Sequence, residues 1–175
     1  MPDFTHETGE VAIRFHRESE WFVASRAAEL YVLRVQANSE RAAELFHRLS
    51  AHLDPLVDIE IEDEREGHHW HGALRSRDDV REAIGRLRWP LASDGGVEIS
   101  LVTADDQLTL MRSLELVICS RRDHWRTRLA AEGIAARASA PAAQWRSERT
   151  VWSAAPELAA ALSALVDRLA LERGP

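Results

Sequence analysis

The stretch VDIEIEDEREGHHWHGAL, residues 57–74, decides the fold because apolar and charged side chains alternate along it. Val57, Ile59 and Ile61 lie on one face of an extended chain, and the carboxylates between them lie on the other. A Glu-Gly step at residues 66–67 is typical of a tight turn, after which the chain returns as a second strand. The stretch therefore predicts a β-hairpin with one face buried and the other in water.

The register of this hairpin follows from keeping its apolar residues together. On the return strand, Trp70 and Leu74 must share a face with the isoleucines. This requirement places Ile61 opposite Gly72. It also places Ile59 opposite Leu74, which leaves the Glu-Gly step as the loop.

The solvent-exposed face of the hairpin then carries carboxylates beside imidazoles. Glu62 is expected opposite His71, and their Cβ atoms would be about 4.5 to 5.5 Å apart. Glu64 is expected opposite His69 in the same way. A divalent transition metal binds such side chains, so these four residues are a candidate metal site. In the alternative, they are cross-strand pairs on an exposed ribbon whose charges prevent association.

The chain from residue 29 to 104 is expected to order its elements as strand, helix, strand, strand, helix, strand. This is the order of ferredoxin-like domains, in which an antiparallel sheet carries both helices on one face. The sequence therefore predicts an α+β, ferredoxin-like fold. The expected elements are a strand at 29–36, a helix at 38–53, the hairpin, a helix that begins after Ser76 and is ended by Pro90 and the SDGG sequence at 93–96, and a strand at 97–104.

Further elements are expected to extend this core within one domain over residues 1–134. A bent strand or hairpin follows near 107–120, and a third helix near 121–133. Residues 135–155 show neither helical nor strand periodicity of apolar residues, and they contain Trp145 and Trp152. This segment is predicted to be either an arm draped over the domain surface or a linker. Residues 156–172 predict a helix that packs on the domain or on a partner, through Leu158, Leu162, Leu165 and Leu169.

Composition excludes some chemistry. The chain has 175 residues and no lysine, so it has neither the lysine of a P-loop nor the lysine that pyridoxal enzymes need. Its net charge of −7 argues against nucleic acid as the main partner. RNA-binding domains of this strand order stack bases on aromatic side chains of the sheet, but Tyr31 and Trp70 are isolated here.

The single cysteine, Cys119, excludes an intrachain disulfide and is expected to be a small buried apolar residue. No signal peptide and no apolar run long enough to span a membrane is visible, so the sequence predicts a cytoplasmic protein.

A second candidate site lies at Ser120, Arg121 and Arg122, in the expected first turn of the third helix. Positive charge at a helix N-terminus opposes the helix dipole, and a bound phosphate or carboxylate would resolve the conflict. In the alternative, Asp123 neutralises the turn and the arginines reach into solvent.

The first functional hypothesis is a non-enzymatic cytosolic module that binds another protein or a second copy of itself. Its basis is that the strands at 29–36 and 97–104 are apolar enough to need cover on both faces. The second hypothesis is a metal-binding protein or metalloenzyme that uses the hairpin carboxylates and histidines. The third is a sensor of phosphate-bearing or other anionic ligands at Ser120 to Arg122. The sequence identifies no catalytic residues.

Overall fold

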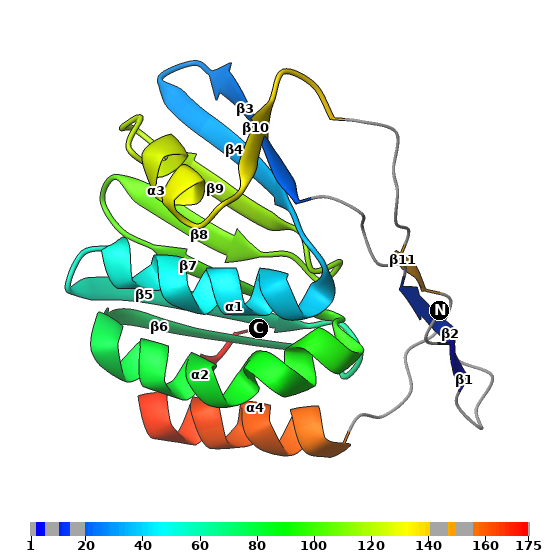
Figure 1. Cartoon of the computed structure of the whole chain (residues 1–175). Coiled ribbons are helices and arrows are strands. Elements are labelled where there is room, and N and C mark those ends of the chain that lie inside the picture. The colour runs from blue at the N-terminus through cyan, green and yellow to red at the C-terminus, as the bar shows by residue number, and fades with distance from the viewer. Residues whose placement is uncertain (1–2, 6–10, 15–19, 141–146, 150–155, 175) are drawn as a thin grey trace.

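The computed structural model describes residues 3–5, 11–14, 20–140, 147–149 and 156–174. The fold is α+β, with a nine-stranded, mostly antiparallel sheet. Figure 1 shows helices α1, α2, α3 and α4 on the same side of this sheet. A separate small sheet is formed by β1 (Asp3–Thr5), β2 (Val11–Arg14) and β11 (Ser147–Arg149).

The large sheet has the strand order β10-β3-β4-β9-β8-β7-β5-β6-β12. Only β10 and β3 pair in parallel. In this order, the strands are β10 (Ala135–Arg137), β3 (Trp21–Ala27), β4 (Leu30–Gln36), β9 (Leu116–Ser120), β8 (Asp106–Leu110), β7 (Val97–Val102), β5 (Leu56–Asp63), β6 (His68–Ser76) and β12 (Glu172–Arg173).

The predicted order of elements from β4 to β7 is confirmed, but the ferredoxin-like arrangement is not. A ferredoxin-like sheet needs the first strand of this order beside the fourth. In this sheet the β8-β9 hairpin lies between β4 and β7, and β4 pairs with β3 and β9. The physical reason is burial, because Leu108, Leu110 and Ile118 of the hairpin are fully buried and need a central position. The strands predicted to extend the core therefore lie at the centre of the sheet.

Helix α1 (Ser39–Leu49) covers one side of the sheet with α2 (Arg77–Asp94), and the short 3₁₀-helix η1 (Ser50–His52) follows α1. Asn38 caps α1, since its Oδ1 accepts a hydrogen bond from Arg41 N at 2.9 Å. Each helix buries an apolar stripe, which includes Leu45, Phe46 and Leu49 of α1 and Val80, Ile84, Leu87 and Leu91 of α2.

Of the two predicted signals for the end of α2, Pro90 is wrong and the SDGG sequence at 93–96 is confirmed. Proline in a helix costs a hydrogen bond and crowds the preceding turn. However, the next residues, Leu91 and Ala92, are buried, so continuing the helix keeps apolar surface in the core. The helix ends instead at Gly95, whose φ of 62° is in the left-handed region that glycine adopts readily.

The third helix, α3 (Trp125–Ala131), begins four residues later than the start predicted at 121. Its first residue is fully buried, and the Trp125 indole Nε1 donates to Asp106 Oδ1 at 2.8 Å. Gly133, with a φ of 81°, follows the helix end as expected.

The C-terminal helix, α4 (Pro156–Leu169), packs on α2 of the same chain. Its four predicted leucines, Leu158, Leu162, Leu165 and Leu169, are all buried. The chain then passes over Gly72 on β6, where a Cβ atom would lie 2.6 Å from Leu171 Cδ2. Glycine is needed there because the chain passes so close.

Two ambiguous regions of the sequence are strands where the structure describes them. The segment that begins at Trp21 is β3. The start of the predicted arm, residues 135–137, is β10. Trp145 and Trp152 lie outside the described residues.

Candidate functional site

The β5-β6 hairpin has the predicted faces. Ile59 and Ile61 are fully buried, and Trp70 packs against the core from the same face. The predicted register is wrong by two residues, because Ile61 pairs with Trp70 and Ile59 with Gly72. A shift of two preserves which face each side chain occupies. Leu74, expected inside, is exposed beyond an irregularity in the pairing between Val57 and Ile59.

The turn is longer than predicted because a buried ion pair holds it. Asp63 and Arg65 have side chains that are each 2% exposed. The guanidinium Nε and Nη2 atoms of Arg65 donate to the two carboxylate oxygens of Asp63 at 2.8 and 2.7 Å. Arg65 N also donates to Asp63 Oδ1 at 3.1 Å. Sequence reasoning missed this pair, although Asp63 continues the buried face of Val57, Ile59 and Ile61.

The structure pairs the predicted metal ligands differently from the predicted register. Glu62 lies opposite His69 rather than His71. Glu64 lies in the turn, where Arg112 Nη1 donates to its Oε2 at 2.7 Å. Arg112 Nη2 also lies 3.6 Å from Glu62 Oε2, so one guanidinium engages both predicted carboxylate ligands.

The two histidines are close together, with ring centroids 6.2 Å apart. His71 Nε2 lies 3.7 Å from Glu172 Oε2 on β12, and His69 is in contact with Gly174. Within the part of the chain that the structure describes, no group of three or more His, Cys, Asp or Glu side chains is arranged to hold a metal. Metal binding by Glu62, Glu64, His69 and His71 stays a prediction.

Glu98 on β7 belongs to the same carboxylate group. Partial burial and the neighbouring Glu62 raise the pKa of Glu98, and Arg112, whose Nε atom lies 3.9 Å away, opposes this rise. Arg112 therefore lies within 4 Å of three carboxylates, and its single positive charge offsets only part of their negative charge.

The candidate anion site is also engaged by its own neighbours. Ser120 is buried, and its Oγ donates to Asp106 Oδ1 at 2.6 Å and accepts from Arg122 N at 2.9 Å. The Arg122 guanidinium is paired with Asp105, and Arg121 is exposed. Both arginines precede α3, which begins at Trp125, so they do not lie in its first turn. Anion binding there stays a prediction.

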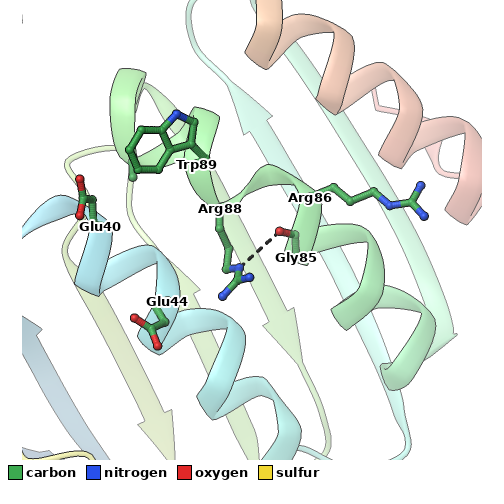
Figure 2. Close-up of a pocket in the computed structure, with 7 residues that line it drawn as sticks. Glu40, Glu44, Gly85, Arg86, Arg88 and Trp89 are labelled. Carbon is green, nitrogen blue, oxygen red and sulfur yellow. Dashed lines mark hydrogen bonds between the residues drawn. The ribbon is translucent and has the colours of Figure 1, made fainter.

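A groove of about 270 Å³ lies between α1 and α2. Figure 2 shows Trp89 and Glu40 near one end of it and Arg88 between the helices, while Arg86 points away toward α4. Trp89 is 67% exposed. Burial and nearby Arg88 lower the pKa of His47 beneath the groove, where it faces Gly85. The groove carries charges of both signs and is widely open, which suits neither a buried reaction nor one class of ligand.

The most extensive feature is the sheet face that α1 to α4 leave uncovered, which we call the open face. Its residues alternate with the buried ones along each strand. Residues that pair across neighbouring strands form a single row on this face across seven strands. The row consists of Val23, Arg34, Val117, Thr109, Ser100, Glu60 and His71.

The open face is apolar at one end and acidic at the other. The apolar half consists of Val23 on β3, Leu30 and Val32 on β4, and Val117 and Cys119 on β9. The ion pair of Arg34 and Glu115 lies among these residues, and Trp21 on the same face of β3 is only 7% exposed. Between the halves, a hydrogen-bonded ladder joins Gln107, Thr109 and Ser100. The acidic half consists of Asp58, Glu60 and Glu62 on β5, His69 and His71 on β6, and Glu98 on β7.

No family model, curated protein or solved structure matches the chain. Over the described residues, no helix combines the length and apolar character needed to cross a membrane.

Proposed function

We propose that this chain is a non-enzymatic, cytosolic protein-interaction module that binds its partner through the open face. The observation that carries the proposal is the group of partly exposed apolar side chains around Arg34 on the side of the sheet opposite the helices, namely Val23, Val32 and Val117. A sheet face with this composition gains free energy when another protein covers it.

The polar residues of the open face are consistent with this role. Arg34 holds Glu115 through two hydrogen bonds of 2.8 and 3.0 Å, which neutralises the charge beside Val117. Ser100 and Thr109 bond to each other at 2.9 Å, so a partner can cover them without stranding a hydroxyl group. The cytosolic part of the proposal rests on the single cysteine, Cys119.

A photo-crosslinking amino acid at position 117 tests the proposal. We expect irradiation of cells that express this variant to give discrete crosslinked bands. The same amino acid at Glu40, which is exposed on the helix side, is the matched control and should give none of these bands. The absence of a discrete product from position 117, at normal expression of folded protein, would overturn the proposal.

A further inference from the structure

We infer that the partner presents to the open face a segment in which an apolar side chain lies beside basic ones, and that this segment binds in a hollow formed by β5, β6 and β7. This inference rests on the proposed function and names the chemistry of the partner. The hollow has a volume of about 400 Å³. Its apolar lining includes Leu56, Leu74 and Val102, and its acidic lining consists of Asp54 and Asp58.

The hollow lies on the open face. Leu56 precedes the buried Val57 on β5, so strand alternation places its side chain on the side away from the helices. Asp58 lies on the same face of β5 and pairs with Val102 of β7. A segment of the partner that crosses β5 and β7 on this face therefore meets the hollow.

Two leucine side chains of the hollow are exposed to solvent. Leu56 is 52% exposed and Leu74 is 70% exposed, although most large apolar side chains of the described residues are buried. One exposed leucine is ordinary on a protein surface, but two that line the same hollow mark a place where another chain gains free energy by covering them. This gain favours an aliphatic or aromatic side chain as the group that enters the hollow.

The backbone holds the Leu74 side chain outward at a cost in free energy. The φ of Leu74 is 51°, in the left-handed region, where the Cβ atom of a leucine crowds the following carbonyl oxygen. The pairing of β5 with β6 is irregular between Val57 and Ile59, and such irregularities redirect side chains. Asp58 Oδ1 holds the irregular segment by accepting a hydrogen bond from Leu74 N at 2.7 Å. Residues held in this way cluster at binding sites, which supports a binding role for Leu74.

The charge around the hollow favours a basic segment. Asp54, Asp58 and Glu60 are exposed, and none of them has an ion-pair partner among the described residues. The two arginines that follow Leu74 on the chain, Arg75 and Arg77, donate to backbone carbonyl groups instead. Lysine or arginine side chains of the partner would supply the missing counter-charges, whereas acidic side chains would be repelled.

Short synthetic peptides test the inference on the full-length chain. The first probe alternates leucine and arginine, the second replaces every arginine by glutamate, and the third replaces every leucine by serine. By fluorescence anisotropy, we expect saturable binding of the first peptide in the micromolar range. The other two should bind about tenfold more weakly or worse, because each lacks one of the two recognised groups. Added salt should weaken the binding of the first peptide, since it screens exposed charges.

Two substitutions separate the apolar from the charged contribution. Leu74→Gly removes the side chain and suits the left-handed backbone, so the variant should bind the leucine–arginine peptide about tenfold more weakly and unfold at the same or a higher urea concentration. Asp58→Asn keeps the oxygen that accepts from Leu74 N and removes only the charge, so it should weaken binding about twofold to fivefold. Glu40→Gln removes an exposed carboxylate on the helix side and is the matched control, which should leave the affinity unchanged.

Three results would overturn the inference: no saturable binding of the leucine–arginine peptide, equally tight binding of the glutamate peptide, or an affinity unchanged by Leu74→Gly. If photo-crosslinking at position 117 still gives discrete bands in that case, the open face binds a partner of different chemistry. The proposed function then holds and this inference does not. If neither experiment detects binding, both are wrong.

Discussion

The two faces of the same strands are built from different residues. On the helix side of β9, Leu116 and Ile118 are fully buried, whereas Val117 and Cys119 between them are only partly covered. On this strand, the larger leucine and isoleucine side chains lie under the helices, and the smaller valine and cysteine side chains lie on the open face. The difference indicates that the covered face supplies most of the stability, which leaves the open face free to bind.

The largest expected effect comes from the buried ion pair on the covered side. Asp63→Ala leaves the Arg65 guanidinium buried without its counter-charge, which should cost about 3 to 5 kcal/mol of unfolding free energy. Urea denaturation measures the loss. The matched control is Glu60→Ala on the open face of the same strand, which should change stability by less than about 0.5 kcal/mol. Equal effects at the two sites would contradict the proposed difference between the faces.

Adjacent residues on β4 allow the next comparison. Leu33 is fully buried, and Leu33→Ala should cost about 2 to 5 kcal/mol through lost burial and a residual cavity. Val32 on the open face is only partly covered, so Val32→Ala should cost less than about 1.5 kcal/mol. Both should be measured at submicromolar concentration, so that association does not contribute. A Val32→Ala loss as large as that of Leu33→Ala would show that the open face is also covered in the monomer.

Gly72 tests the close passage of the C-terminal segment over the covered face. In Gly72→Ala the new methyl group would meet Leu171 Cδ2 at 2.6 Å and Arg75 Nε at 2.9 Å. Such overpacking should cost about 1 to 3 kcal/mol. Adding Leu171→Ala should recover part of the loss, which a double-mutant cycle in urea measures. No coupling between the two sites would contradict the predicted contact.

Local periodicity was sufficient to predict which side chains lie on which face. The alternation of Val57, Ile59 and Ile61 and the stripe from Val80 to Leu91 both mark buried residues correctly. Periodicity along one strand or helix does not depend on which strand lies beside it. It therefore predicts which face a side chain occupies, but it does not predict the order of the strands in the sheet. The place of the β8-β9 hairpin is set by long-range packing, so the ferredoxin-like arrangement predicted from element order was not confirmed.

The candidate sites were predicted less well because each depended on the exact strand register or on the exact residue at which a helix begins. The hairpin register was wrong by two residues because the Asp63–Arg65 pair extends the turn. Arg112, distant in sequence, engages Glu62 and Glu64, and no local pattern could indicate this. Alternation along the strands predicts which residues lie on the open face. Only the tertiary structure shows that no described helix covers them.

Acid should affect the two sides of the sheet in opposite directions. On the helix side, burial lowers the pKa of His47 and of His52, with smaller contributions from nearby arginines. A histidine with a lowered folded-state pKa contributes stability above its unfolded value of about 6.5, and the contribution is lost as pH falls through the folded pKa. We expect the unfolding free energy to decline below about pH 6.5 by about 0.5 kcal/mol from both residues, since the rings are partly solvated.

Urea titrations between pH 7.5 and 5, ranges that bracket the ordinary histidine pKa of about 6.5, measure this decline. The double variant His47→Gln/His52→Gln should flatten it. His68→Gln is a control on the hairpin, where the residue is only partly buried. A decline that is unchanged in the double variant would assign it to other groups.

On the open face, the carboxyl group of Glu98 responds in the opposite sense, with the smallest effect. Burial and Glu62 raise its folded-state pKa above the ordinary 4.5, so the charged form is disfavoured in the folded protein. Stability from this group is present below the unfolded pKa and is lost as pH rises through the folded pKa. Glu98→Gln should therefore raise the unfolding free energy at pH 7 by about 0.5 kcal/mol or less and change it little near pH 4. Glu60→Gln, which removes another carboxylate of the open face, is the matched control. This gain in stability exists only if the repulsion between the carboxylates outweighs the attraction of Arg112 for Glu98. A loss of stability at pH 7 would instead show that the attraction of Arg112 for the carboxylates is the stronger effect in the acidic half.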